Sequence, residues 1–442
     1  MAYTRLSLRK YANKSIRSIN DQAYLKAADL PGFVYSLFYL FGAYMVLPLV
    51  DVPLLGLSLS APMMFFIAIP CIFSPPKPWA KEYQKWVFLA LFFWIGIFIS
   101  AAVNGLGGSN QKLDFEDYGI LIQFIYWLLA FIITTYMASQ KNTLRKMVKI
   151  LGWLVMLLAV LRWGEAVITG NIVGADIRTV ILSINTYGIM FSTFSPFLLL
   201  LIFDNKGWKR LVALGGYLLL IGAAAINGSR GSWISISVGI AISLIFYLLF
   251  RPKKAFGLVS IILVALLGLF FIWNSSPQIR SALQTRFSTL ESLEEDKNYV
   301  FRELMVQKGL RLFKENPIVG VGPGRFEETY TELDVPTLFG NVTNYDRYLG
   351  KSAHNSYMNI LAELGLVGVI PYLILLLSLV LGNFRAAIGS AREQDLLPMA
   401  VFLSLIQMSI HFWVLSSITN TATWFIYGLS ASVIMLGNSK GN

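Results

Sequence analysis

Charged residues are scarce in this chain. Of its 442 residues, 14% are charged and 56% are hydrophobic, and the mean hydropathy is +0.63. Soluble domains carry about 25% charged residues, so this sequence has too few ionic groups to cover a water-exposed surface of its size. A soluble enzyme, a disordered chain and a coiled coil are excluded, which leaves a polytopic membrane protein.

Cysteine and clustered acidic residues are also lacking. The single cysteine, Cys71, lies inside an apolar run, so no intrachain disulfide and no thiolate metal cluster can form. The acidic stretch Glu294-Glu295-Asp296 is typical of a solvated charge run, and no pair of DxD type accompanies it. We therefore expect chemistry without a metal and without a cofactor.

Apolar residues are gathered into twelve runs that approach the length of a membrane helix, which is about 20 residues. The pattern predicts an all-α polytopic membrane protein with about 12 transmembrane helices. The runs lie near residues 33–50, 54–73, 86–103, 118–137, 147–163, 181–203, 211–226, 233–250, 255–273, 358–382, 399–417 and 420–437.

The 36 lysines and arginines predict the orientation. If the N-terminus is cytoplasmic, more than half of them fall on the cytoplasmic side, and the short outer loops hold only Lys112, Arg178 and Arg230. The positive-inside rule therefore favours cytoplasmic N- and C-termini. The expected organisation is a basic leader (1–31), nine transmembrane helices (32–273), one large outer loop (274–357), three further helices (358–437) and a cytoplasmic tail (438–442).

The large outer loop carries a near-neutral mixture of charges and one amphipathic stretch, residues 302–313. A turn-rich segment with Pro317 and the glycines of 320–324 ends that stretch, so a small helical subdomain is predicted. The glycine-rich segment lacks the GK[ST] ending and the preceding strand of a nucleotide-binding loop. The apolar side of the amphipathic stretch is expected to consist of Leu304, Met305, Leu310, Leu312 and Phe313.

The chain contains two histidines. His354 precedes the tenth apolar run on the outer side, where an imidazole can act as a general base on a hydroxyl or simply hydrogen-bond to a loop carbonyl. His411 lies in the middle of the eleventh run. For His411 a hydrogen bond between helices is the favoured interpretation, and a functional role is the alternative.

A polar turn at residues 227–232, Asn-Gly-Ser-Arg-Gly-Ser, separates the seventh and eighth runs. Its glycines let the backbone approach a ligand, and the amides that open the following helix favour an anion. Arg230 can form paired hydrogen bonds to phosphate oxygens, or it can extend to the phosphate of a membrane lipid. The residues alone leave both interpretations open.

Taken together and in chain order, these motifs resemble the O-antigen ligase and polymerase superfamily. The resemblance covers mainly residues 225–370, together with the twelve-span layout. The segments that carry it are Ser229-Arg230-Gly231, Arg302-Glu303, the ENPIVGVGPG stretch at 315–324, His354-Asn355-Ser356-Tyr357, and ELGLVG at 363–368.

The resemblance implies a GT-C-like membrane glycosyltransferase in the inner membrane of Gram-negative bacteria, with the large loop in the periplasm. Such an enzyme takes a glycan from an undecaprenyl-pyrophosphate carrier and joins it to lipid A-core by an inverting, metal-independent reaction. The implied partners are this lipid-linked donor, the lipid A-core acceptor and membrane lipids. Nucleic acid, metal and cofactor are not expected.

The resemblance also implies which residues form the site. Arg230 and Arg302 would stabilise the charge of the departing pyrophosphate, and His354 would accept the proton of the attacking hydroxyl. These three are the expected catalytic residues. The further substrate-binding candidates are Ser229, Asn355, Arg178 and Arg325.

Other functions remain open from the sequence. An O-antigen polymerase or a protein O-oligosaccharyltransferase of the same superfamily would differ only in the acceptor. A transporter or lipid flippase with twelve spans is less favoured, because the sequence shows no paired broken helices in matching positions. A transporter also has no need of the long polar loop at 274–357.

Overall fold

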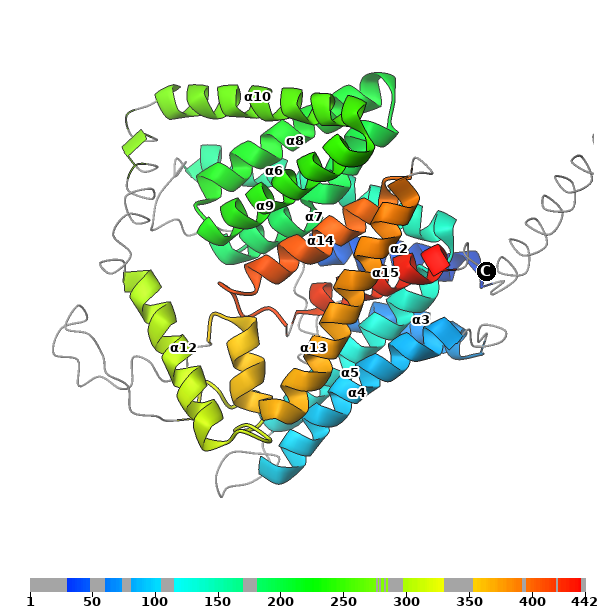
Figure 1. Cartoon of the computed structure of the whole chain (residues 1–442), viewed down its shortest axis with the longest axis vertical. Helices are drawn as coiled ribbons and strands as arrows, with labels where there is room; N and C mark the ends of the chain where they lie inside the picture. The colour runs from blue at the N-terminus through cyan, green and yellow to red at the C-terminus, as the bar shows by residue number, and fades with distance from the viewer. Residues whose placement is uncertain are drawn as a thin grey trace, which may run out of the picture.

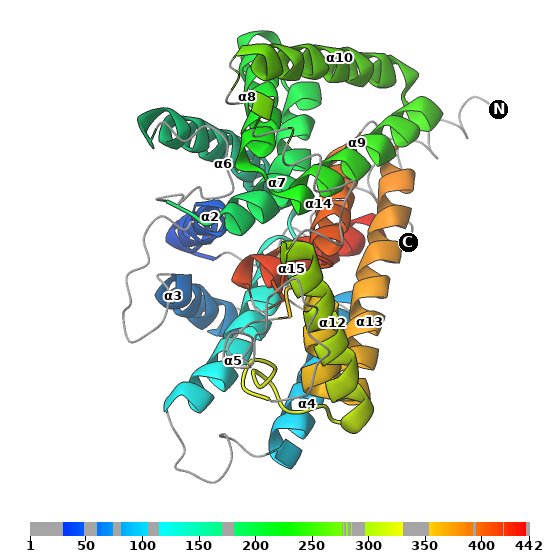
Figure 2. The same ribbon diagram turned by 90° about the vertical axis from the view of Figure 1, so that its left-hand side faces the viewer.

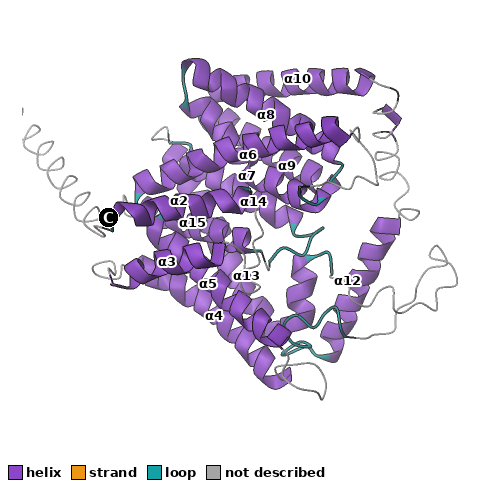
Figure 3. Cartoon of the chain, turned by 180° about the vertical axis from the view of Figure 1, so that it is seen from behind, coloured by secondary structure: helices purple, strands orange, loops and turns teal. Residues whose placement is uncertain are grey.

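The computed structural model describes residues 30–47, 60–73, 81–104, 115–169, 181–275, 297–329, 353–391, 395–418 and 420–438, with a few single residues between 277 and 284. Within these ranges the chain forms helices joined by turns, and no strand is present (Figures 1 and 3). The all-α class is thereby confirmed for the described part of the chain. Most of the leader at 1–31 and of the tail at 438–442 lies outside it.

Each of the twelve apolar runs coincides with a helix, and one further helix, α12, lies in the expected outer loop. The bounds are α2 (Gly32–Val46), α3 (Ser60–Phe73), α4 (Lys81–Asn104), α5 (Phe115–Met137), α6 (Lys141–Thr169), α7 (Ile184–Asp204), α8 (Gly207–Asn227), α9 (Arg230–Phe250), α10 (Pro252–Ser275), α12 (Lys297–Glu315), α13 (Ser356–Ala391), α14 (Leu397–His411) and α15 (Thr421–Asn438).

Six of the described helices are long and apolar enough to cross a membrane, namely α4, α7, α8, α9, α10 and α13. Shorter apolar stretches occur in α2, α3, α5, α14 and α15. The protein is therefore a membrane protein by the length and composition of its helices, and the count of twelve spans stays a prediction.

Helix α7 forms the centre of the bundle. In its apolar window 89% of the residues are buried, because α6, α8, α9 and α14 pack around it. Helix α10 is the opposite case, with 17% of its window buried, and it lies along the edge of the molecule (Figure 1). Its Phe256, Leu263 and Phe270 are more than half exposed, as expected for side chains that face lipid.

Helix α13 is broken at Gly365, which has a left-handed φ of 57°. The short first part, residues 356–364, and the long second part meet at a sharp corner in Figure 1. A break of this kind leaves carbonyls without partners on one side and N–H groups without partners on the other. The corner can therefore exist only where another segment supplies hydrogen bonds.

The segment after α12 supplies those bonds. The N–H of Val321 donates to Ala362 O at 2.9 Å, and the N–H of Leu366 donates to Pro317 O at 3.0 Å. A second bond of each type runs from Gly322 N to Glu363 O and from Val367 N to Ile318 O. The ENPIVGVGPG and ELGLVG motifs are thus the two halves of one joint.

Helix α4 completes this joint. The Ser100 hydroxyl oxygen lies 2.6 Å from Val319 O and 2.9 Å from Glu363 O, so it contacts both halves. Gly96 lies one turn earlier on α4, and a Cβ there would collide with the Val367 carbonyl. A glycine at this position lets α4 approach the corner closely enough to place the Ser100 hydroxyl.

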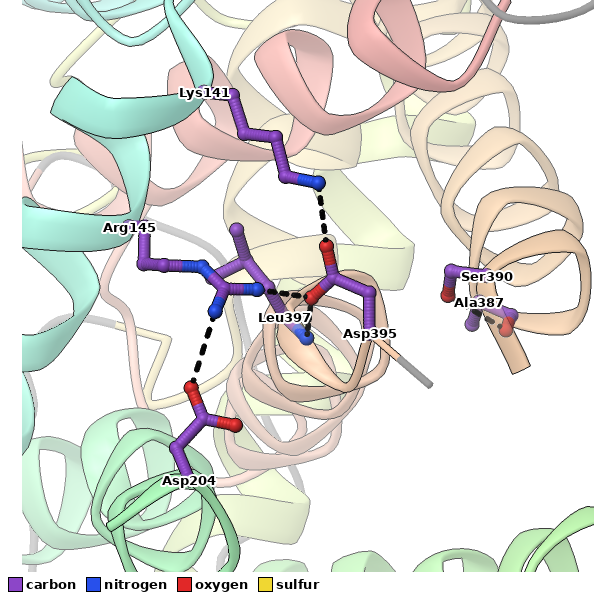
Figure 4. A network of polar contacts seen from close by, with 7 residues as sticks. All are labelled: Lys141, Arg145, Asp204, Ala387, Ser390, Asp395 and Leu397. Atoms are coloured by element: carbon purple, nitrogen blue, oxygen red, sulfur yellow. Dashed lines mark hydrogen bonds and ion pairs between the residues drawn. The ribbon is translucent and has the colours of Figure 1, made fainter. Parts of the chain in front are cut away.

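An ion-pair network closes the opposite end of the bundle (Figure 4). Asp395 precedes α14 and is contacted by Arg145 Nη2 at 2.6 Å and by Lys141 Nζ at 3.1 Å, both from α6. Arg145 also lies 3.5 Å from Asp204 at the end of α7. The Leu397 N–H donates to Asp395 at 3.2 Å, so the carboxylate also caps the start of α14.

Asp395→Asn should lower stability in a pH-dependent manner. Burial alone raises the pKa of Asp395, but hydrogen bonds from Lys141 and the Leu397 N–H, and the charge of Arg145, hold the pKa below its ordinary value. A depressed folded pKa stabilises the fold above the unfolded pKa of about 3.9, and this is lost as the pH falls through the folded value. Because both cations are partly exposed, we expect a loss of about 1–2 kcal/mol at pH 7.

The unfolding midpoint in detergent, measured from pH 7 down to pH 3, checks this prediction. The wild-type midpoint should fall toward that of the variant as the carboxylate is protonated. Glu315→Gln is the matched control, because its partner Arg311 is 3.6 Å away on an exposed helix face and the pair should contribute about 0.5 kcal/mol or less. Equal effects of the two variants at pH 7 would contradict the prediction.

Candidate functional site

The Arg230 turn joins α8 to α9. Gly228 ends α8 with a left-handed φ of 70°, Ser229 is the N-cap of α9, and Arg230 is the first helical residue and half-buried. The first N–H groups of a helix have no partner within it and carry partial positive charge. The turn therefore presents a guanidinium and a helix N-terminus together, as the sequence predicts for an anion site.

His411 packs directly against this turn. It is the last residue of α14 and only 1% exposed, so its expected position in the middle of a span is wrong. Its Nδ1 lies 3.4 Å from the Ser192 hydroxyl of α7. Cβ atoms added to Gly188 and Gly231 would lie 3.4 and 3.3 Å from His411 Cε1, so two glycines make room for the ring.

Arg302 approaches the same place from α12. It is half-buried, and its positive charge acts on the His411 ring. His411 therefore contacts the turn of one predicted catalytic arginine and experiences the charge of the other. Sequence reasoning treated His411 as a contact between helices and did not connect it to the arginines.

His354 contacts Phe301, the residue that precedes Arg302 in α12. Its ring meets that of the neighbouring Phe301 edge-on, with centroids 5.9 Å apart and an interplanar angle of 72°. The His354 backbone adopts a left-handed φ of 48°, which is uncommon for a residue other than glycine. This conformation turns the chain abruptly between the outer loop and α13.

The start of α13 is fixed to the end of α14. The N–H of Ser356 donates to Phe412 O at 2.9 Å, and its hydroxyl donates to Leu415 O at 2.8 Å. The side-chain oxygen of Asn355 accepts hydrogen bonds from Tyr357 N at 3.0 Å and Met358 N at 3.1 Å, and so caps α13. Asn355 thereby caps the helix that begins just after His354, and Ser356 fixes this end of α13 to Phe412, the residue after His411.

His411 contacts Gly231 beside Arg230, the charge of Arg302 acts on His411, and Phe301 beside Arg302 contacts the His354 ring. We call Arg230, Arg302, His354 and His411 the cationic cluster. Helix α9 begins at Arg230, and the partial positive charge of its N-terminus adds to the charge of the guanidinium group. Such an arrangement suits a ligand with several anionic oxygens, with an imidazole at its edge.

The other predicted site residues have different surroundings. Ser229 is buried against Gly188, inside the turn that presents Arg230. Arg325 lies at the corner of α13, where its Nη1 donates to Asn104 O at 2.9 Å and caps the end of α4. Arg178 lies outside the described residues.

Helix α12 packs alongside the first part of α13 and forms a small core of its own with the turn after it (Figures 1 and 2). Leu304, Met305 and Leu312 are buried there, as expected, whereas Leu310 is 41% exposed and its expected place on the apolar side is wrong. Buried Lys308 takes part of that side instead, with its Nζ 4.8 Å from the Phe326 ring centroid. Burial lowers the pKa of Lys308, and the charge of Glu327 partly offsets this.

This small core determines where Arg302 lies on α12 relative to the buried face of the helix. Leu304 and Met305 anchor one face of α12, and Arg302 lies about half a turn earlier on the helix, at the edge of that face. The joint at Gly365 fixes the end of α12 to α13. Arg302 therefore lies on a helix that packs against α13, and His354 precedes the start of α13 by two residues.

Comparisons with known proteins find similarity in the part of the chain that carries these residues. Residues 215–373 match the family model described as O-antigen ligase, and this range contains Arg230, Arg302, His354 and both halves of the joint. An uncharacterized protein of Haemophilus influenzae is 26% identical over 208 residues, which are 46% of this chain. The chain spans about half of the length of that curated relative, 50% of which is covered.

Proposed function

We propose that this chain transfers a glycan from undecaprenyl pyrophosphate to a hydroxyl of lipid A-core, a proposal supported by the match of residues 215–373 to the O-antigen ligase family model. The reaction takes place at the periplasmic face of the inner membrane. It proceeds with inversion and needs no metal or other cofactor. The match to this family model supports glycosyl transfer in general, and the donor, the acceptor and the orientation are parts of the proposal.

The observation that supports the proposal most is that His411 contacts the Arg230 turn and experiences the charge of Arg302, while Phe301 beside Arg302 contacts the His354 ring. Arg230, Arg302 and His354 come from α9, α12 and the residues before α13. A pyrophosphate leaving group needs donors that are already in place when its charge develops. Two guanidinium groups and the N-terminus of α9 meet that requirement.

In the proposed reaction, the acceptor hydroxyl oxygen attacks the anomeric carbon on the face opposite the pyrophosphate. A new carbon–oxygen bond forms as the bond to the pyrophosphate oxygen breaks, and that oxygen takes the bonding electron pair. The proton of the acceptor moves to His354, acting as general base. Arg230 and Arg302 stabilise the charge on the departing undecaprenyl pyrophosphate.

The surrounding architecture supplies the remaining requirements. Lipid-facing helices, such as α10 with its exposed Phe256, Leu263 and Phe270, provide an apolar environment for a polyprenyl chain. Trp413 is 63% exposed just beyond His411, where an amphipathic ring suits the membrane–water boundary. The substrates would therefore meet at the membrane–water boundary, with the polyprenyl chain of the donor in the lipid and its glycan in water.

Replacing His354 with asparagine tests the role of the imidazole. Asparagine tolerates the left-handed backbone better than alanine does, so the turn should be preserved, but it cannot accept a proton at neutral pH. Loss of a general base lowers the rate by about 10²–10⁴-fold. The measurement is transfer by purified protein of glycan from undecaprenyl pyrophosphate to lipid A-core, and a wild-type rate at equal abundance would refute the assigned role.

A further inference from the structure

Arg162 is a buried cation that the proposed reaction does not use. It lies in α6 about two turns before the helix ends, and its side chain is 0% exposed. Val167 and Ile168, at the end of the same helix, are 71% and 86% exposed. Arg162 therefore lies beneath the rim of the bundle rather than in its middle.

The donors of this guanidinium have no acceptor within the described part of the chain. Neither Nε, Nη1 nor Nη2 of Arg162 makes a hydrogen bond there. The negative charge of Glu165, one turn along α6, acts on Arg162. Both oxygens of Glu165 are engaged with other donors, namely Oε1 with Ile181 N at 3.2 Å and Oε2 with the Tyr187 hydroxyl at 3.1 Å.

A buried guanidinium with unsatisfied donors is strongly unfavourable. Taking such a group out of water carries a large desolvation penalty unless hydrogen bonds replace those of the solvent. The ring of Tyr187, whose centroid is 5.9 Å from Arg162 Cζ, contacts the cation without accepting from its N–H groups. A planar group with five N–H donors is well matched to the oxygens of a phosphate.

We propose that Arg162, between α6 and the start of α7, binds a phosphate-type oxyanion at a second site distinct from the cationic cluster. Tyr187 faces Arg162, whereas the next residue, Gly188, faces Ser229 and His411. Successive residues of a helix point about 100° apart, so the two sites occupy neighbouring sides of α7. An enzyme that handles two phosphate-bearing lipids has use for two such sites, and in this respect the inference rests on the proposed function.

A purely structural ion pair is the competing explanation, and Glu165→Gln separates the two. In an ion pair that only supports the fold, loss of the carboxylate leaves Arg162 as an uncompensated buried charge, so the variant loses stability and gains no affinity for anions. At an oxyanion site, removal of the neighbouring negative charge strengthens anion binding. The two explanations therefore predict opposite changes in anion affinity.

The experiment measures binding of radiolabelled inorganic pyrophosphate to the purified full-length chain in detergent by equilibrium dialysis. An Arg230→Met background weakens the cationic cluster, so that the remaining binding reports on Arg162. In that background Arg162→Met should raise the Kd by about 10- to 100-fold, as expected for a hydrogen-bonded charge pair, and Glu165→Gln should lower it. Lys149→Met, on the same helix toward its other end, should leave the Kd unchanged.

A second part of the experiment asks whether the site near Arg162 binds a lipid phosphate or free inorganic phosphate. Vesicles containing undecaprenyl phosphate are compared with inorganic phosphate at equal phosphate concentration, and the preferred source is the one whose binding depends more on Arg162. Arg162→Lys keeps the charge and most of the stem, so a folded Lys variant with weakened binding supports recognition by the guanidinium. Unchanged pyrophosphate binding in a folded Arg162→Met or Arg162→Lys variant overturns the second site. Because no glycan transfer is measured, failure here leaves the test of His354 standing.

Discussion

Alanine at Gly365 or at Gly320 should remove most of the folded protein. The two glycines lie on opposite sides of the joint, with left-handed φ values of 57° and 68°. A Cβ on Gly365 would lie 2.6 Å from Gly320 N and from Ile318 O, and a Cβ on Gly320 would collide with the Glu363 carbonyl. Backbone atoms cannot rotate away as side chains can, so the two segments would have to separate.

Separation would break the backbone hydrogen bonds that hold the corner. The Leu366 N–H and the Ala362 carbonyl would lose Pro317 O and Val321 N as partners. Strain from a left-handed residue costs about 1–2 kcal/mol, and buried groups without partners cost about 1–3 kcal/mol each. We expect a total loss of about 3–5 kcal/mol, which is comparable to the whole stability of many domains.

The yield of monodisperse protein and its unfolding midpoint in detergent measure this effect. Gly389→Ala is the matched control, because Gly389 lies in the second part of α13 and a Cβ there meets nothing within 4 Å. Alanine favours a helix by about 1 kcal/mol over glycine, so the control should be neutral or stabilising. If Gly365→Ala were as stable as Gly389→Ala, the joint could not have the structural role described.

Arg302→Met should reduce glycan transfer by about 10²–10³-fold, as when one charge-stabilising donor is removed from an active site. Arg302 is half-buried, and its charge acts on His411, which touches the Arg230 turn. Removing it would leave one guanidinium to stabilise the pyrophosphate. The loss should therefore fall on kcat more than on KM, because the extra charge develops only in the transition state.

Arg311→Met is the matched control, because it removes the same charge from the same helix. Arg311 lies on the same helix, is 49% exposed and pairs with Glu315, so its removal should leave transfer close to the wild-type rate. Arg302→Lys should be intermediate, since it keeps the charge but loses the planar pair of donors. Equal activity of the Arg302 and Arg311 variants would exclude Arg302 from the site.

The helices were predictable because their signals are local. Each apolar run became a helix, and the Asn-Gly-Ser-Arg-Gly turn ended α8 and opened α9 as expected, since glycine and serine act on their own neighbours. The corner at Gly365 was not predicted. It depends on backbone bonds to Pro317 and Val321, and no pattern within ELGLVG indicates a partner so far away in the chain.

The site was predicted as separate residues rather than as a cluster. Motifs indicate Arg230, Arg302 and His354 one by one, and their role in a site stays a prediction, because the relation between them depends on how α12 and α14 pack. His411 was placed in mid-span because the apolar run continues past it, whereas α14 ends there and hydrogen bonds to Ser356 hold the next residues. Leu310 was misassigned because spacing alone could not show that Lys308 would be buried in its place.

The most direct test of the central claim is glycan transfer by the purified chain. In nanodiscs with undecaprenyl-pyrophosphate-linked glycan, lipid A-core and EDTA, the account predicts glycan-capped lipid A-core with inverted anomeric configuration and stoichiometric release of undecaprenyl pyrophosphate. Elongation of the lipid-linked glycan without capping would instead identify a polymerase. Failure to transfer glycan to any acceptor, or transfer that stops when EDTA is added, would contradict the account.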